Sequence, residues 1–129
     1  MKVLIVEDNG FSMQGFQDYL RTLDINYEMA SSAEDSVSIF RDTLNEGYLF
    51  DCVFMKLIMP GMSGFDAAKE FRKLETEFGL NSDTRHFICG ITAEISDRKY
   101  RLFLILFRIK EEVRRDWHRP SSLKADRYQ

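Results

Sequence analysis

Hydrophobic residues occur in this sequence as short runs, separated by longer stretches in which they recur every three or four positions. The runs lie at residues 3–6, 27–30, 52–55 and 87–91, and each predicts a strand, the second more weakly than the others. An unbroken run such as 3–6 is typical of a strand covered on both faces, as in a parallel sheet. The pattern therefore predicts buried strands with helices packed around them.

The intervening stretches predict three amphipathic helices, because their apolar residues fall on one helical face. These residues are Phe16, Tyr19, Leu20 and Leu23 in the first helix, Val37, Phe40 and Leu44 in the second, and Phe65, Ala68, Phe71 and Leu74 in the third. The second helix is expected to begin at Ser31 or Ser32, since an acidic residue follows each of them by three positions. It is expected to end at Gly47, a residue type that favours a helix C-terminus.

Strands and helices alternate through most of the chain, and this order predicts an α/β protein with a doubly wound parallel sheet. A chain of 129 residues suits one domain, expected over residues 1–120, with a polar tail at 121–129. The C-terminal part leaves two interpretations open. Apolar positions between Tyr100 and Trp117 have helical spacing, whereas residues 102–107 alone also fit a fifth strand.

Composition narrows the function only a little. A net charge of -3 argues against a dedicated nucleic-acid binder. The longest apolar run, at 102–107, is far shorter than the ~20 residues of a membrane span, and no secretory signal is present, so a cytoplasmic protein is expected. Cys52 and Cys89 lie in apolar runs and are expected to be buried thiols. His86 lies in a polar loop and is expected at the surface.

The residues that follow the strands suggest the chemistry. Ligands of doubly wound sheets bind beyond the carboxyl ends of the strands, where Glu7, Asp8, Lys56 and Thr92 are expected. Two adjacent carboxylates make a plausible Mg²⁺ site, and a third on the next strand would complete it or act as a nucleophile toward a phosphoryl group. A hydroxyl such as that of Thr92 would stabilise the phosphoryl oxygens. The third carboxylate is missing, because residue 56 is a lysine.

Three segments together resemble the receiver domains of the response-regulator family, the phosphoacceptor modules of two-component and phosphorelay signalling. KVLIVEDN (2–9) is similar to the first strand and acid pair of the family, and DCVFMKLIMPGMSG (51–64) to its third strand and following loop. HFICGITAE (86–94) is similar to its fourth strand. The resemblance implies a flavodoxin-like fold with strand order 2-1-3-4-5. It also implies, as partner, a histidine kinase, a phosphotransfer protein or another signalling domain.

The resemblance also implies roles for individual residues. Glu7 and Asp8 fall on the metal-binding acids, Thr92 on the switch hydroxyl, and Ala93 on the small residue beside the phosphate site. Lys56 falls on the phosphoacceptor, and there the family pattern is broken. An ammonium cannot become an acyl phosphate, and it donates hydrogen bonds where a metal needs an oxygen ligand.

Two further parts of the family pattern lie around the site. Pro60 and Gly64 match the shape of the loop after the third strand. The family's lysine after the fifth strand, which precedes a proline, has no clean match. Arg114 lies at about the expected spacing, whereas Arg119 precedes Pro120 but lies several residues too far along the chain.

Lys56 leaves two interpretations open. Its ammonium can occupy the space of a divalent ion, bonded to Asp8 or Glu7, or its side chain can extend to solvent. The first interpretation predicts a non-enzymatic protein-binding module that works without phosphorylation, with no cofactor, and with Mg²⁺ only if the acid pair still binds it. The alternative is a receiver that accepts a phosphoryl group from a histidine kinase. An unrelated flavodoxin-like cofactor binder would need a Ser/Thr/Gly-rich phosphate loop after the first strand, where this sequence is acidic.

Overall fold

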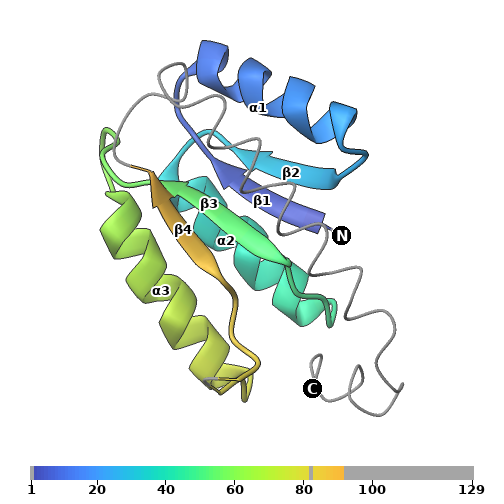
Figure 1. Ribbon diagram of the computed structural model, residues 1–129. Helices are drawn as coiled ribbons and strands as arrows, with labels where there is room; N and C mark the ends of the chain where they lie inside the picture. Colours follow the sequence, from blue (N-terminus) through green and yellow to red (C-terminus); the bar gives the residue numbers. More distant parts are fainter. Residues whose placement is uncertain (1, 82, 92–129) are drawn as a thin grey trace.

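The computed structural model describes residues 2–81 and 83–91, in which strands and helices strictly alternate (Figure 1). In chain order the elements are β1 (Lys2–Val6), α1 (Gly10–Thr22), β2 (Asn26–Ala30), α2 (Ala33–Asn45), β3 (Cys52–Lys56), α3 (Gly64–Glu77) and β4 (Ile88–Ile91). The strands form a parallel sheet in the order β2-β1-β3-β4. The predicted doubly wound α/β fold is confirmed for this part of the chain. A fifth strand, a C-terminal helix and the tail at 121–129 lie outside the described residues.

The sheet register explains why the first strand is apolar without interruption. β1 lies between β2 and β3, and residues Val3 to Val6 are at most 1% exposed. Val6 at the end of β1 pairs with Met55 on β3, so the residues that follow them leave the sheet at the same edge. That edge is the carboxyl end of the strands, and it carries Glu7 and Lys56.

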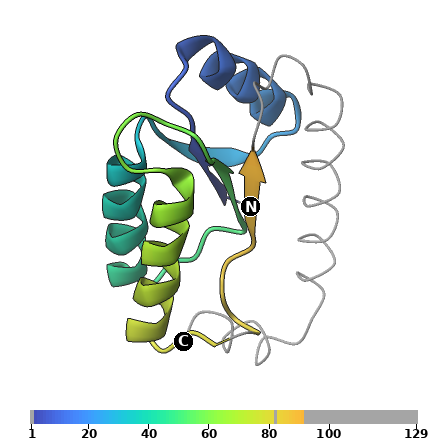
Figure 2. The same ribbon diagram turned by 90° about the vertical axis from the view of Figure 1, so that its left-hand side faces the viewer.

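Helices cover both faces of the sheet, α1 on one side and α2 with α3 on the other (Figure 2). The α1 side of the core contains Val3, Ile5 and Phe54 of the sheet with Phe16 and Leu20 of the helix. On the other side the rings of Phe40 and Phe71 stack with their centroids 4.1 Å apart and join α2 to α3. Each strand thus contributes alternate side chains to two separate apolar layers.

The predicted inward face of α3 was wrong at its start. Ser63 caps the helix by accepting a hydrogen bond from the backbone N–H of Asp66, and Gly64 is the first helical residue. With this start, Gly64, Ala67 and Phe71 face the sheet, and Phe65 remains 57% exposed. The prediction placed Phe65 on the buried face because it followed the large apolar residues. Glycine and alanine, which allow close packing here, are too weakly hydrophobic to mark that face in the sequence.

His86 is also a correction, because it is buried rather than exposed, with 4% of its surface accessible. Its ring lies 4.5 Å from that of Phe40, centroid to centroid, and its Nδ1 lies 2.9 Å from Oε2 of Glu75. A buried carboxylate and an aromatic neighbour therefore hold a side chain that its polar sequence context placed in solvent. Cys52 is buried as predicted, Cys89 is half-buried, and both are free thiols.

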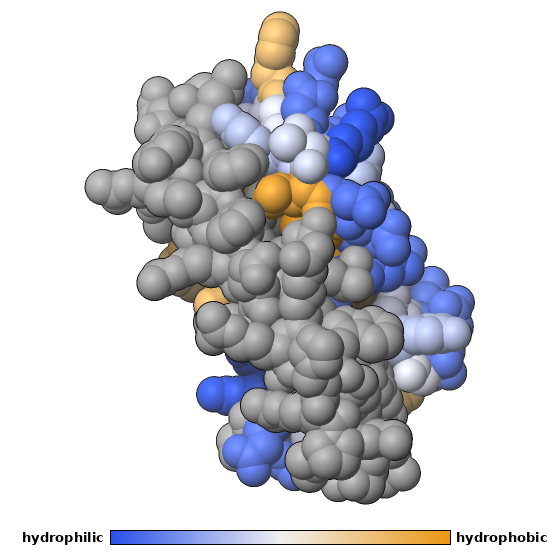
Figure 3. Space-filling model, turned by 45° about the vertical axis from the view of Figure 1, so that its right-hand side comes forward, coloured by the Kyte–Doolittle hydropathy of each residue, from blue (hydrophilic) through white to orange (hydrophobic). Residues whose placement is uncertain are grey.

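The described surface carries both polar and hydrophobic side chains. On the side shown in Figure 3 the described side chains are mostly hydrophilic, with a small hydrophobic group among them. The large hydrophobic side chains that remain exposed are Phe11, Tyr48, Ile58, Phe65, Phe78 and Phe87. None of the helices in the described ranges has the length and apolar character that crossing a membrane requires.

Candidate functional site

The ends of β1 and β3 bring three charged side chains together at the carboxyl edge of the sheet. The backbone N–H of Glu7 donates to the carbonyl of Ala30, which ties the end of β1 to the end of β2. Lys56 pairs with Ile91, and the N–H of Leu57 donates to the carbonyl of Ile91. These backbone contacts fix Glu7, Asp8 and Lys56 on rigid strand ends rather than on free loops.

The ammonium of Lys56 lies between the two carboxylates. Its Nζ is 3.0 Å from Oε1 of Glu7 and 2.8 Å from Oδ1 of Asp8. The Lys56 side chain is 20% exposed, that of Asp8 is 30% exposed, and that of Glu7 is 1% exposed. Both contacts are charge-assisted hydrogen bonds of ordinary length. The side chain therefore lies across the acid pair, in the arrangement that the first interpretation of Lys56 predicted.

The pair of carboxylates keeps Lys56 charged. The hydrogen bond to Asp8, aided by the one to Glu7, raises the pKa of the Lys56 ammonium against the opposing effect of partial burial. A pKa above the ordinary value near 10.4 means that Lys56 is fully protonated at neutral pH. A protonated amine has no lone pair, so it can neither ligate a metal nor attack phosphorus.

Glu7 is the most buried member of the site. Its Oε1 also accepts a hydrogen bond from the backbone N–H of Asn9, at 3.1 Å. Its Oε2 is buried and has no hydrogen-bond donor within the described residues. Asn9 in turn caps α1, because its Oδ1 accepts from the N–H groups of Phe11 and Ser12 at 2.9 and 3.1 Å.

The loop after Lys56 folds closely back on the strand end. A Cβ atom at Gly64 would lie 2.2 Å from the carbonyl oxygen of Lys56, so no side chain fits there. The N–H of Gly64 donates to the carbonyl of Leu57 at 2.9 Å and closes the loop. Gly61 has a φ of +77°, a conformation that favours glycine, and the preceding Pro60 is exposed.

Glu34 has a role that sequence reasoning missed. Ser32 caps α2 by accepting from the N–H of Asp35, so Glu34 is not the capping partner of Ser31. Instead its Oε1 accepts from the backbone N–H of Met62 at 2.9 Å, and this hydrogen bond lowers the pKa of the Glu34 carboxyl. The contact ties the start of α2 to the loop after Lys56. The position of Glu34 in the first turn of a predicted helix was the only sign of such a contact in the sequence.

Arg72, Glu75 and His86 form a second polar network that the sequence pattern did not reveal. Nη1 of Arg72 donates to Oε1 of Glu75 at 2.8 Å and to the carbonyl of His86 at 3.0 Å. The backbone N–H of His86 donates to Oε2 of Glu75. Burial raises the pKa of Glu75, but the hydrogen bonds from His86 and Arg72 outweigh it and hold that pKa below its ordinary value. The network fastens α3 to the segment that enters β4.

Several predicted site residues are not placed by the structure. Thr92, Ala93, Arg114 and Arg119 lie outside the described residues. Between residues 2 and 91, position 82 aside, no group of three or more His, Cys, Asp or Glu side chains is arranged to hold a metal. Glu7 and Asp8 both contact the ammonium of Lys56, and their role as metal ligands stays a prediction.

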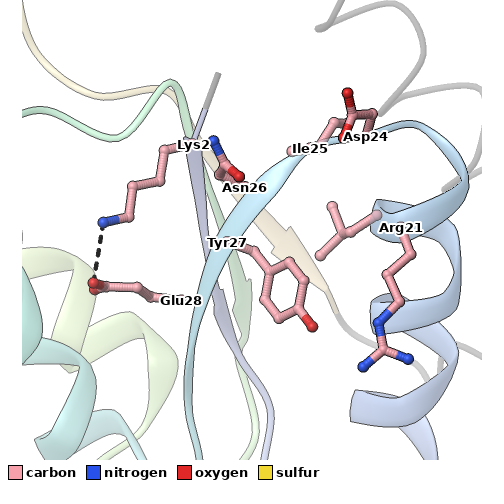
Figure 4. A pocket seen from close by; sticks show the side chains of 8 residues that line it. Lys2, Arg21, Asp24, Ile25, Asn26, Tyr27 and Glu28 are labelled. Atoms are coloured by element: carbon pink, nitrogen blue, oxygen red, sulfur yellow. Dashed lines mark hydrogen bonds and ion pairs between the residues drawn. The ribbon is translucent and has the colours of Figure 1, made fainter.

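A shallow pocket of about 550 Å³ lies at the opposite edge of the sheet, where β1 and β2 begin (Figure 4). Its walls include Arg21, Asp24 and Tyr27, and Lys2 is paired with Glu28 at 3.1 Å. Charges of both signs line it and already neutralise one another in part. This pocket has no link to the predicted site.

The fold and the site define a class of protein: a doubly wound, flavodoxin-like α/β module with an acid pair at the carboxyl edge of its sheet. The sequence profile described as "Response regulator receiver domain" matches residues 3–100. The chain therefore belongs to the response regulator receiver domain family, the receiver domains of two-component phosphorelay systems.

Among curated proteins, the chain is 36% identical over 80 residues to the osmolarity two-component system protein SSK1 of Saccharomyces cerevisiae, covering 62% of this chain and 10% of SSK1. It is 34% identical over 85 residues to the response regulator sskA of Aspergillus fumigatus, covering 66% of this chain and 9% of sskA. The chain thus spans about a tenth of the length of these curated relatives.

Two solved structures show the same fold. One is the Saccharomyces cerevisiae Ssk1 receiver domain in a co-crystal with the histidine phosphotransfer signaling protein Ypd1, at 34% identity and a TM-score of 0.61, covering 80% of this chain and 72% of that one. The other is the receiver domain of the histidine kinase CKI1 from Arabidopsis thaliana, complexed with Mg²⁺ and BeF3⁻. Its identity is 22% and its TM-score 0.66, covering 85% of this chain and 89% of that one, and it shows the fold alone.

Proposed function

We propose that this receiver domain is a protein-binding module of a phosphorelay that works without accepting a phosphoryl group itself. The observation that carries the proposal is the ammonium of Lys56 at the strand end where the family places its phosphoacceptor aspartate. Its raised pKa leaves the nitrogen without a lone pair at neutral pH, so it cannot replace a carboxylate as nucleophile. In this proposal the module spans residues 1–120, is cytoplasmic, and has no catalytic activity of its own.

The same geometry bears on metal binding. Glu7 and Asp8 are oxygen donors of the kind that Mg²⁺ prefers, but each already has one oxygen bonded to the Lys56 ammonium. An ion at this position would have to displace that ammonium from a partly buried pair of carboxylates and would meet its positive charge. We therefore expect no cofactor, and Mg²⁺ binding only where the lysine is removed.

The proposed partner is a phosphotransfer protein or histidine kinase, or another signalling domain. The Ssk1 receiver domain, 34% identical to this chain, was crystallised with Ypd1. The carboxyl edge of the sheet, where Glu7, Asp8 and Lys56 lie, is called the Lys56 edge below. Three exposed hydrophobic side chains lie at this edge: Phe11 (91% exposed) in the first turn of α1, Ile58 (73%) in the loop after β3, and Phe65 in the first turn of α3. Exposed apolar residues next to a polar site are typical of a protein-binding surface.

Binding to Ypd1 of Saccharomyces cerevisiae, measured by isothermal titration calorimetry, tests the binding function. We expect a complex with the unaltered chain, and a Kd raised about tenfold or more by Phe11→Ala, as for an interface anchor. The matched control is Phe87→Ala, because Phe87 is also well exposed but precedes β4 at the opposite edge of the sheet. Equal effects of the two substitutions would place the interface elsewhere.

A phosphoryl donor tests the alternative, a receiver that accepts phosphate from a histidine kinase. The overall similarity to response regulators supports that alternative, and Lys56 opposes it. The chain is incubated with phosphoramidate and Mg²⁺, and its intact mass is recorded. We expect no gain; a gain of one phosphoryl group, sensitive to hydroxylamine as an acyl phosphate is, would establish the alternative.

A further inference from the structure

The charges at the Lys56 edge do not cancel. Two carboxylates, Glu7 and Asp8, face one ammonium, which leaves one negative charge on the three side chains. Glu34 and Asp66 add exposed carboxylates in the first turns of α2 and α3, whose N-termini lie at this same edge. Among the described residues the surface around Lys56 is therefore acidic, although a cation lies at its centre.

The local backbone offers an anion little in return. The N-terminus of a helix normally attracts phosphate through its free N–H groups. At α1, the side chain of Asn9 already accepts hydrogen bonds from the N–H groups of Phe11 and Ser12. In the loop after β3, the carboxylate of Glu34 takes the N–H of Met62. These three N–H groups, which could otherwise bind a phosphoryl oxygen, are thus occupied by side chains of the chain itself.

The hydrogen-bonding groups that remain suit a different ligand. An ammonium has three N–H donors, and Lys56 uses two of them on Glu7 and Asp8, leaving one for an acceptor from outside. Asp8 is partly exposed, and its second carboxylate oxygen can accept a hydrogen bond from outside. One donor beside one carboxylate acceptor matches an imidazole ring, which offers one donor and one acceptor when neutral.

We propose that this edge recognises its partner by phosphorylation state, binding a phosphotransfer protein whose histidine is unphosphorylated and rejecting the phosphohistidine form. The inference rests on the proposed function. A neutral or protonated imidazole meets a complementary site, whereas a dianionic phosphoryl group meets a cluster with a net negative charge. Repulsion between like charges a few ångströms apart is large enough to weaken the phosphorylated complex about tenfold or more. Lys56 and Asp8 are then specificity-determining residues rather than remnants of a lost reaction.

The test compares the Kd values for two preparations of yeast Ypd1, one unphosphorylated and one phosphorylated on histidine with phosphoramidate. Intact mass confirms that the phosphoryl group stays on Ypd1 during the titration. We expect the unaltered chain to bind the unphosphorylated form about tenfold or more tightly than the phosphorylated one. Asp8→Asn removes one negative charge but keeps an oxygen near Lys56. This variant should reduce the ratio of the Kd for phosphorylated Ypd1 to the Kd for unphosphorylated Ypd1.

Glu46→Gln is the matched control, because it also removes one negative charge but lies at the far end of α2, and it should leave the ratio unchanged. Equal affinity for the two forms, tighter binding of the phosphorylated form, or equal effects of the two variants would overturn the inference while leaving the proposed binding function in place. Failure to bind either form would overturn the proposed function, and the inference with it.

Discussion

At the scale of a single residue, Lys56 is the counter-ion of a buried carboxylate, that of Glu7. Glu7 is almost completely inaccessible, and a buried carboxylate without a partner is expensive. The Nζ of Lys56, 3.0 Å from Oε1 of Glu7, compensates that charge and reduces the repulsion between the carboxylates of Glu7 and Asp8. The ammonium of Lys56 thereby supplies the positive charge that the two neighbouring carboxylates need.

Lys56→Met should therefore destabilise the fold. Methionine preserves most of the side-chain length but leaves Glu7 and Asp8 facing one another, with an expected loss of about 3 kcal/mol in the free energy of unfolding. Urea denaturation measures it. The control is Lys73→Met, since Lys73 pairs with Glu70 on an exposed helix surface and should contribute less than about 1 kcal/mol. A similar small loss in both variants would show that Lys56 does not stabilise the acids.

Glu75 should make stability depend on acid pH. Its pKa is lowered in the folded chain, so its contribution is complete above the unfolded value of about 4.3 and is lost as pH falls through the lower folded value. Glu75→Gln should cost about 2 kcal/mol at pH 7, because it weakens buried hydrogen bonds to His86 and Arg72.

The difference between Glu75→Gln and the unaltered chain should then shrink below about pH 4. Thermal melts between pH 3 and pH 7 measure it. Glu77→Gln, an exposed change on the same helix, is the control and should give no such pH-dependent difference. A constant difference across the range would mean that Glu75 stabilises the fold by its shape and not by its charge.

At the scale of elements, the turn from β3 into α3 packs closely against the backbone of Lys56. Gly64 lies against the carbonyl of Lys56 with no room for a Cβ atom, and Glu34 fixes the same loop from α2. Gly64→Ala should lower the free energy of unfolding by about 2–3 kcal/mol, because backbone must move to relieve the overlap. Gly10→Ala is the control, as its Cβ would meet nothing within 4 Å and alanine favours a helix. Chemical denaturation measures the free energy of unfolding of both variants. Equal values would contradict the close contact between Gly64 and the carbonyl of Lys56.

Elements were predictable where their signal is periodic and local. Hydrophobic and capping patterns predicted a strand at 3–6, a helix start at Ser31 or Ser32 and a helix end at Gly47. The structure has β1 over Lys2–Val6, a cap at Ser32 and Gly47 directly after α2. The face of α3 that packs against the sheet could not be predicted from apolar residues at its start, because Gly64 and Ala67 pack closely without being strongly hydrophobic. The burial of His86 could not be inferred either, since its partner Glu75 lies eleven positions away and carries no pattern that marks it.

At the scale of the whole molecule, the site depends on strand order more than on local sequence. Glu7 and Lys56 are 49 positions apart and meet because β1 and β3 are neighbours in a parallel sheet. The resemblance supplied that neighbourhood in advance, so their contact could be predicted, whereas the tie between Glu34 and Met62 required the actual course of the loop. The roles of Thr92 and of an arginine near residue 114 remain predictions.

Whether this edge of the sheet can bind Mg²⁺ and accept a phosphoryl group can be tested by placing a carboxylate at position 56. Lys56→Asp would place three acidic side chains at one edge, so without metal it should be less stable than the unaltered chain. Mg²⁺ should then stabilise it, by about 2.7 kcal/mol at a hundred times the Kd, and leave the unaltered chain unchanged in thermal melts. Phosphoramidate should add one phosphoryl group to this variant.

Lys56→Asn is the control for that experiment, because it removes the ammonium without adding a charge and should show neither phosphoryl uptake nor strong Mg²⁺ stabilisation. If Lys56→Asp binds Mg²⁺ but takes up no phosphoryl group, the metal site is intact and another part of the chain has diverged as well. If Mg²⁺ stabilises the unaltered chain as much as Lys56→Asp, the ammonium does not exclude the ion, and the electrostatic basis of the proposed function fails.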